Sequence, residues 1–205
     1  MHRFYLAPED WNPDSLVLAG AEAHHARDVL RLQPAGRVVV FNGRGHEITA
    51  EIAKVTRDEI LLRKMHEARV PPLPCRITLA QAIPKGGKNM DLIVQKAVEI
   101  GAAEIAPLIS ERTIVHLETK EAAQKQAKWQ QVAIEAAKQC GQNWLPTVQP
   151  PRKLSDFFVN CRGRRVACTR LRNAADTAAA TEQRSRFEIN WFPSIRRGPF
   201  KNGAG

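Results

Sequence analysis

Residues 85–116, KGGKNMDLIVQKAVEIGAAEIAPLISERTIVH, constrain the fold of this chain more than any other stretch. A strand-like run at residues 76–80 precedes them. Within them, apolar side chains recur at the spacing of one helix face, and the helix ends at Gly101, where a left-handed cap costs least. A second apolar run covers residues 105–109. Strand, basic glycine turn, helix and strand predict a βαβ unit, and therefore an α/β fold with a parallel sheet.

The composition, 43% apolar and 25% charged, is that of an ordinary folded protein. No run approaches the ~20 apolar residues of a membrane span, and the opening residues, MHRFYLAPEDW, lack the apolar core of a signal peptide. We therefore expect a cytoplasmic protein with no membrane partner. No CxxC or other metal-ligand spacing is visible, so neither a disulfide framework nor a metal site is expected. The cysteines are Cys75, Cys140, Cys161 and Cys168.

The net charge of +10 would ordinarily indicate a polyanionic partner such as nucleic acid. Its distribution weakens that inference. Residues 162–205 hold nine arginines and one lysine against three acidic residues, a net of +7, which leaves +3 for the rest of the chain. Charge alone therefore does not indicate RNA binding.

Residues 1–70 have the pattern of a small β-rich domain. A buried-strand run at 37–41 and an alternating run at 47–55 flank the turn sequence NGRG, which predicts a hairpin. A further strand is expected at 59–64, and a helix at 21–32 that Pro34 and Gly36 end. Short strands with one helix predict a compact β-barrel.

Residues 71–75 contain three prolines and predict a stiff linker. The α/β domain then covers residues 76–161. It continues with a helix at 120–140 that Gly141 caps, an extended piece at 148–151, and a short helix or strand at 154–159. Residues 162–205 show no sustained period of either strand or helix.

Two interpretations are open for the basic turn that contains Lys85, Lys88 and the glycines between them. These residues form either a solvated turn, or a contact for RNA phosphates beside a helix N-terminus, where free N–H groups favour anions. The stretch lacks the GxxxxGK[ST] spacing of a phosphate-cradling loop, which excludes a nucleotide-hydrolysing enzyme.

Residues 110–113, which include Arg112, follow a predicted parallel strand at the edge where open α/β sheets bind ligands. They are a functional site or a surface turn. Glu135 and Gln139 are four residues apart and share one helix face, which is either a solvated stripe or part of a site.

The helix predicted at 21–32 is basic. It carries His24, His25, Arg27 and Arg31, which either contact RNA phosphates or form a solvated face. No catalytic triad and no paired-carboxylate pattern is visible.

Several motifs, in order over residues 2–160, resemble those of the RsmE family. They are HRFYL, HHARDVLRL, PAGRVVVFNGRG, IPKGGKNMDLIVQKAVEIGAAEIAPLISERTIV and KWQQVAIEAAKQCGQNWLPTVQPP. The family consists of bacterial enzymes that use S-adenosylmethionine to methylate N3 of a uridine in 16S ribosomal RNA. The resemblance implies a PUA-like RNA-binding β-barrel, a SPOUT-type parallel α/β domain with a trefoil knot, and a homodimer whose partner is 16S rRNA or the small ribosomal subunit.

The resemblance also implies site residues. The uridine N3 must lose its proton during methyl transfer, so a cation near the developing imide anion lowers the barrier. We assign this role to Arg112, with Glu135 or Gln139 positioning the base; these three are the expected catalytic residues. Lys96 and Glu99 also fall on family motif positions. The expected RNA-binding residues are Arg3, His25, Arg27, Arg31, Lys85 and Lys88.

Two family motifs are missing after residue 161. In the family, a Gly-Pro-Glu-Gly-Gly loop and a later Leu-Gly-x-Arg-Ile-Leu-Arg run hold the methyl donor in the knot, and neither occurs in this sequence. We therefore expect an incomplete knot and no intact cofactor-binding residues, with residues 162–205 an aberrant basic tail that a frameshift would explain. The alternatives to an active methyltransferase are a catalytically dead RNA-binding remnant and a folding-defective fragment.

Overall fold

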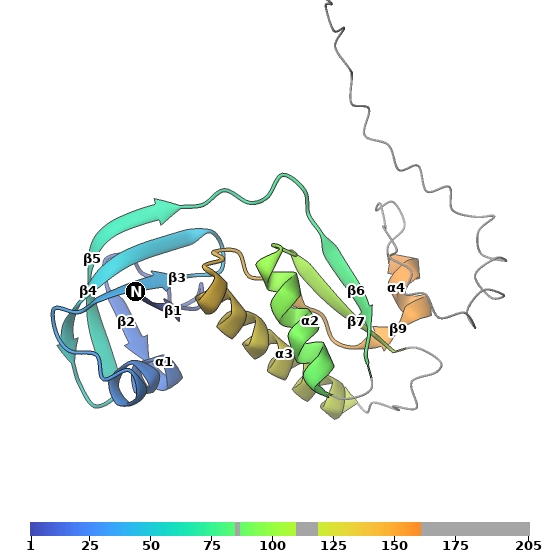
Figure 1. The fold of residues 1–205 in the computed structure, drawn as a ribbon, viewed down its shortest axis with the longest axis horizontal. Helices are drawn as coiled ribbons and strands as arrows, with labels where there is room; N and C mark the ends of the chain where they lie inside the picture. Colours follow the sequence, from blue (N-terminus) through green and yellow to red (C-terminus); the bar gives the residue numbers. More distant parts are fainter. Residues whose placement is uncertain (85–86, 110–118, 161–205) are drawn as a thin grey trace, which may run out of the picture. The chain divides into compact units, whose positions relative to one another are not determined.

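The computed structural model describes residues 1–84, 87–109 and 119–160, and by its contacts Met1–Asn160 is one compact unit (Figure 1). Two sheets make up this unit. Five strands from the first 69 residues form one, and four strands from residues 78–153 form the other. The tail predicted to begin at residue 162, and with it the expectation of an incomplete knot, lies outside the described residues.

The first sheet has the strand order β1-β3-β4-β5-β2. All of its neighbouring strands are antiparallel except β1 and β3, which are parallel. The strands are β1 (His2–Tyr5), β2 (Leu16–Ala19), β3 (Arg37–Phe41), β4 (His46–Val55) and β5 (Glu59–Arg69). Between β2 and β3 the chain forms the helix α1 (Gly20–His24) and one turn of π-helix, η1 (His25–Val29).

The hairpin predicted around NGRG is confirmed, with Val40 opposite Ile48 in the β3–β4 register. Every strand of this sheet, together with α1 and η1, contributes to one buried core; its largest fully buried side chains are Phe4, Leu16, Leu18, Ile48, Ile52 and Ile60. The strands β1 and β2 were not predicted, because four-residue segments are too short for an alternating pattern to stand out.

The helix predicted over residues 21–32 is too long. The helical segment ends at Val29, where the Leu30 N–H donates to the His25 carbonyl 3.0 Å away, as in a π-turn. Arg31 then takes a left-handed conformation with φ of 50°, which ends the helix before Pro34 is reached.

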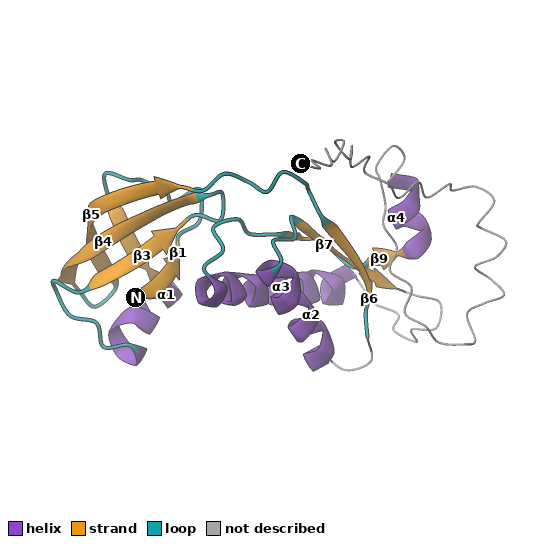
Figure 2. Ribbon diagram, turned by 45° about the horizontal axis from the view of Figure 1, so that its top comes forward, coloured by secondary structure: helices purple, strands orange, loops and turns teal. Residues whose placement is uncertain are grey.

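The second sheet is parallel and confirms the predicted βαβ unit. Its central strand, β7 (Glu104–Ile109), pairs with β6 (Thr78–Ala82) along one edge and with two short strands along the other. These are β8 (Thr147–Val148) and β9 (Arg152–Lys153), followed by the helix α4 (Leu154–Asn160). The crossover helices are α2 (Gly87–Glu99) and α3 (Thr119–Cys140), and Figure 2 shows both on the same side of β6 and β7.

The core of this part lies between α2, α3 and β7. The side chains of Met90 and Val94 are fully buried, at the four-residue spacing that predicted the helix. Gly101 then ends the segment with φ of 76°, as the sequence predicted. Phe41, from the first sheet, also belongs to this core, so the two sheets share packed side chains.

The carboxyl ends of β6 and β7 lead into residues 85–86 and 110–118, which lie outside the described residues. The predicted site residues Lys85 and Arg112 are among them, and nothing is described of the Lys88 side chain. Among the described helices, none is long and apolar enough to cross a membrane.

We predict that Gly45→Ala destabilises the protein more than Gly141→Ala. Both glycines have left-handed φ angles, of 87° and 80°, so alanine costs about 1–2 kcal/mol at either position. At Gly45 a Cβ atom would also lie 2.6 Å from the Val70 carbonyl oxygen and 2.7 Å from the Trp144 ring, whereas Gly141 has nothing within 4 Å. Overpacking adds about 1–3 kcal/mol. Urea unfolding measures both variants, and equal losses would contradict the close packing at Gly45.

Candidate functional site

The described part of the predicted site lies where α1 and η1 meet the C-terminal end of α3. Lys138 makes the central contact. Its side chain is only 8% exposed, and its Nζ donates to Glu22 Oε1 at 2.5 Å and to Glu135 Oε1 at 3.0 Å. Glu22 is on α1 and Glu135 is on α3. One buried lysine therefore joins the helix that packs with the first sheet to a helix that packs with the second.

Four ionisable groups therefore form what we call the Lys138 cluster: Glu22, His25, Glu135 and Lys138. Burial raises the pKa of Glu22, while its hydrogen bond and ion pair with Lys138 lower it. Glu135 raises this pKa further and His25 lowers it. A buried pair of this kind is close to neutral in net stability, but removing one partner leaves an uncompensated charge.

The two residues predicted to position the base differ in their surroundings. Glu135 is 46% exposed and accepts hydrogen bonds from Lys138 and from Gln131 Nε2, the latter at 3.1 Å. Gln139, one turn further along α3, is exposed to solvent. The structure therefore brings Glu135, but not Gln139, into the Lys138 cluster.

Both residues lie beyond the amino edge of the parallel sheet. The side-chain amide of Gln130 donates to the Pro146 carbonyl, and its oxygen accepts from Val148 N–H. Val148 pairs with Ile105 near the start of β7, so the part of α3 after Gln130 extends past that end of the sheet. From Thr119 to Glu135 the helix rises about 24 Å, at 1.5 Å per residue.

Of the predicted RNA-binding residues, His25 and Arg27 lie on the π-turn η1 and Arg31 follows it; this geometry occurs often at functional sites. The ring of His25 meets Phe4 edge-on, with centroids 6.3 Å apart. Arg27 donates to both oxygens of Asp28, at 2.8 and 2.7 Å, which neutralises part of its charge. Arg31 is exposed and makes no ion pair with another described residue. It is the cation of this group that is most available to a phosphate.

Arg3, also predicted to bind RNA, is 15% exposed and lies at the boundary between the two sheets. Its guanidinium donates to Glu47 Oε2 at 2.6 Å and to Asn143 Oδ1 at 2.5 Å, and lies 4.8 Å from the centroid of Phe41. These contacts join β1 and β4 to the loop after α3. Its role in RNA binding stays a prediction.

Lys96 and Glu99 pair with each other on the surface of α2, with the Lys96 Nζ 2.8 Å from Glu99 Oε2. Among the described residues, no group of three or more His, Cys, Asp or Glu side chains is placed to hold a metal ion.

The sequence did not single out Glu22, Lys138 or Asn143. The three-residue spacing of Glu135 and Lys138, which places them side by side on a helix surface, was the available signal for that pair. No local pattern indicates that Glu22 meets them from more than 100 residues away.

Comparison with known proteins gives two family matches. The model described as an RNA methyltransferase domain matches residues 71–190, and the model described as an RNA methyltransferase PUA domain matches residues 18–65. The methyltransferase match covers the linker between the two sheets and the whole described parallel sheet. The PUA match runs from the end of β2 into β5.

Curated relatives are similar to this chain over most of its length. The chain is 32% identical over 163 residues to ribosomal RNA small subunit methyltransferase E of Synechocystis, covering 79% of this chain and 52% of the relative. It is 31% identical over 134 residues to the Bacillus subtilis protein of that name, covering 64% of this chain and 51% of the relative. The chain thus spans about half the length of these relatives.

Solved structures agree with this similarity. Ribosomal RNA small subunit methyltransferase E from Neisseria gonorrhoeae, bound to S-adenosyl methionine, matches with a TM-score of 0.67 and 35% identity, over 77% of this chain and 64% of that one. A putative methyltransferase from Legionella pneumophila, in complex with the same cofactor, matches with a TM-score of 0.68 and 35% identity, over 76% and 64%.

We predict that Lys138→Met destabilises the protein in a pH-dependent way. Because the folded-state pKa of Glu22 is raised, its contribution to stability is present below its ordinary pKa and is lost as pH rises through the folded-state value. Without Lys138 this pKa rises further, so the loss extends to higher pH. At neutral pH we expect a deficit of about 3–5 kcal/mol, which shrinks toward pH ~4, where Glu22 is protonated in both states.

Urea unfolding at a series of pH values measures this effect. The matched control is Lys120→Met, at an exposed position of the same helix, which should change stability by less than about 0.5 kcal/mol at any pH. A Lys138→Met deficit that does not vary with pH would show that Glu22 is not the group left unpaired.

Proposed function

Because this chain belongs to the RNA methyltransferase family of the ribosomal RNA small subunit methyltransferase E proteins, we propose that it methylates N3 of a uridine in 16S ribosomal RNA. The observation that carries the proposal is the match of the methyltransferase model to residues 71–190, directly after the PUA match at 18–65. An RNA-binding module joined to a methyltransferase module suits a large RNA substrate.

The methyl donor in this proposal is S-adenosylmethionine, which two structural neighbours contain. When bound, it supplies an electrophilic methyl group on its sulfonium. The described residues do not form its site by themselves, since the segments after β6, β7 and α4 lie outside them. A binding measurement tests the fit of the donor, and the residues named next act on the RNA.

The reacting base would lie at the carboxyl edge of the parallel sheet, where open α/β sheets bind their ligands. Arg112 follows the end of β7 by three residues. Its guanidinium would stabilise the negative charge that develops on the uridine imide as N3 loses its proton. Arginine suits this role because it stays charged at any pH at which the protein is folded.

Glu135 and Gln139 belong to a different end of the molecule. They lie beyond the amino edge of the sheet, about 24 Å along α3 from Thr119, whereas three residues after Ile109 span at most about 11 Å. Arg112 and Glu135 of one chain are thus poorly placed to share a base. We propose a homodimer, in which the barrel-side residues of one protomer act with the carboxyl edge of its partner.

The alternative is that Glu135 acts within its own chain as a positioning residue. It holds Lys138, and through it α1 and the basic turn η1, in the arrangement that receives RNA. Both versions retain Arg112 as the residue nearest the chemistry.

We predict that the protein converts a uridine of small ribosomal subunits to N3-methyluridine when S-adenosylmethionine is supplied. Mass spectrometry of the digested 16S RNA detects the product, and calorimetric titration measures donor binding. If the protein retains RNA but gives no heat with S-adenosylmethionine, methyl transfer is contradicted and the chain is an RNA-binding remnant. If it neither retains RNA nor binds S-adenosylmethionine, the proposed substrate is contradicted as well.

We predict that Arg112→Ala lowers kcat by about 10²–10³, the effect of removing one donor from an oxyanion site. The loss should be smaller at high pH, where the uridine imide is deprotonated more readily without help. Arg112→Lys should recover part of the rate, because it keeps the charge but not the planar fork. An unchanged pH profile in Arg112→Ala would contradict the assigned role.

A subunit-mixing experiment distinguishes the two roles of Glu135. In a shared site, mixing Arg112→Ala with Glu135→Gln protein gives heterodimers with one intact site, and activity returns. If Glu135 acts only within its own chain, mixing restores nothing. The matched control is a mixture of two separately prepared Arg112→Ala samples, which has no intact site in either case.

A further inference from the structure

A cleft with a cavity volume of about 690 Å³ lies at the amino edge of the parallel sheet, opposite the edge assigned to the chemistry. Five segments and Gln130 of α3 line it. The segments are the end of β1 with the loop after it, residues 5–9; the hairpin turn at residues 42–44; the linker at 70–76; the loop at 101–103 that precedes β7; and the loop at 142–147 after α3. The cleft is separate from the Lys138 cluster, none of whose members lines it.

Trp144 forms a rigid wall of the cleft. Its indole Nε1 donates to the Val70 carbonyl at 3.0 Å, and the ring packs so closely on Gly45 that a Cβ there would lie 2.7 Å away. Gly45 in turn donates its N–H to the Asn143 carbonyl at 2.8 Å. The indole is thus fixed on one side while it lines the cavity, as a stacking platform requires.

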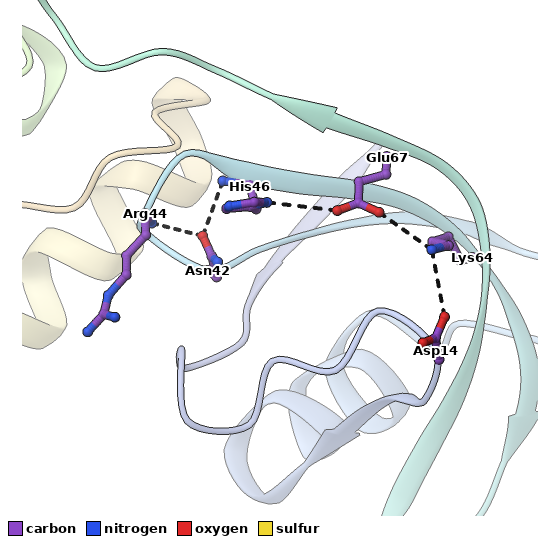
Figure 3. Close-up of polar contacts among 6 residues, drawn as sticks. All are labelled: Asp14, Asn42, Arg44, His46, Lys64 and Glu67. Carbon is purple, nitrogen blue, oxygen red and sulfur yellow. Dashed lines mark hydrogen bonds and ion pairs between the residues drawn. The ribbon is translucent and has the colours of Figure 1, made fainter.

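Two arginines line the same cavity. The Asn42 side-chain oxygen accepts hydrogen bonds from the backbone N–H groups of Arg44 and His46, which shapes the hairpin turn. Figure 3 shows the Arg44 side chain reaching away from this Asn42–His46 contact. Arg44 makes no ion pair with another described residue, and Arg76, 72% exposed, has only a 3.7 Å contact with Glu104.

The charge of Arg44 acts on the cleft wall. Burial raises the pKa of Tyr5, which lines the cleft, and the nearby Glu9 adds to that rise, whereas Arg44 opposes it. The charged residues that line the cleft are the cations Arg44 and Arg76 and the anion Glu9, so its lining is net positive. An anionic ligand with a flat ring matches this combination of arginines and indole.

We propose that this cleft binds one unpaired nucleotide of the RNA substrate, with its base stacked on Trp144 and its flanking phosphates contacted by Arg44 and Arg76. Aromatic platforms beside cationic side chains are the usual way in which proteins hold single-stranded RNA. The inference rests on the proposed function in taking RNA as the substrate.

Within one protomer, the nucleotide in this cleft is not the one that is methylated at the carboxyl edge. The six residues of β7 separate the two edges of the sheet by about 17–20 Å, at 3.3 Å per residue. The cleft therefore positions the RNA at a distance from the reacting uridine, and binding there is used to orient the substrate.

Quenching of tryptophan fluorescence by a short single-stranded oligouridylate tests the proposal, with filter retention as a second readout. Trp144→Leu should weaken binding by about 5- to 150-fold, the effect of losing one base–aromatic stack. Trp144→Phe keeps a stacking ring but loses the bond to Val70, and should retain most of the affinity. Circular dichroism checks that each variant is folded.

Salt dependence tests the arginines. In Arg44→Gln and in Arg76→Gln, the slope of log affinity against log salt should fall by about 0.7, the value for one phosphate contact to a single strand. The control is Arg63→Gln, an exposed arginine on β5 that pairs with Glu51 and does not line the cleft.

The outcomes separate the two proposals. If the wild-type protein binds no RNA, both the cleft and the RNA substrate are wrong. If it binds RNA and Trp144→Leu, Arg44→Gln and Arg76→Gln bind equally well, the cleft proposal alone is overturned. Equal changes in Arg63→Gln and in the two cleft arginines would also overturn it, because they would show only a general effect of positive charge.

Discussion

The loop that follows α3 joins the two sheets of the described chain, and the rest of the structure depends on it. Asn143 is 5% exposed. Its side-chain oxygen accepts a hydrogen bond from the Arg3 guanidinium at 2.5 Å, and its backbone carbonyl accepts one from the Gly45 N–H at 2.8 Å. The Leu145 N–H donates to the Gly43 carbonyl at 3.0 Å. Buried polar groups need partners. Because this loop and the hairpin turn satisfy each other, the first and second sheets are joined by a bonded boundary and not by the proline linker alone.

The two ends of α3 have different surroundings. Its first residue follows the segment that carries Arg112, and its last two turns hold α1 through the buried contact between Lys138 and Glu22. A helix of 22 residues is about 33 Å long. The proposed chemistry at one end and the proposed RNA contacts at the other would suit a substrate much larger than a single nucleotide, because contacts far from the reacting atom supply binding energy that orients it.

Local patterns in the sequence predicted most of the regular structure. The hairpin followed from NGRG between two β-rich runs, and α2, α3 and β7 followed from apolar spacing. The prediction failed where local pattern is weak or is overridden. The strands β1 and β2 have four residues each and are stabilised by pairing with β3 and β5, which are distant in the chain. The π-turn of η1 and the left-handed conformation of Arg31 end the predicted helix earlier than its sequence alone indicates.

By itself, the sequence determined the local elements, the βαβ unit and the family resemblance, because helix and strand periodicity and short motifs are properties of neighbouring residues. Only the tertiary structure decided that Arg3 is enclosed by Glu47 and Asn143, that Lys138 is buried against Glu22, and that Trp144 and Arg44 line one cleft. Each of these depends on polar groups from distant segments that meet only when the sheets pack together. Arg3, which we predicted to bind RNA, therefore also takes part in that packing.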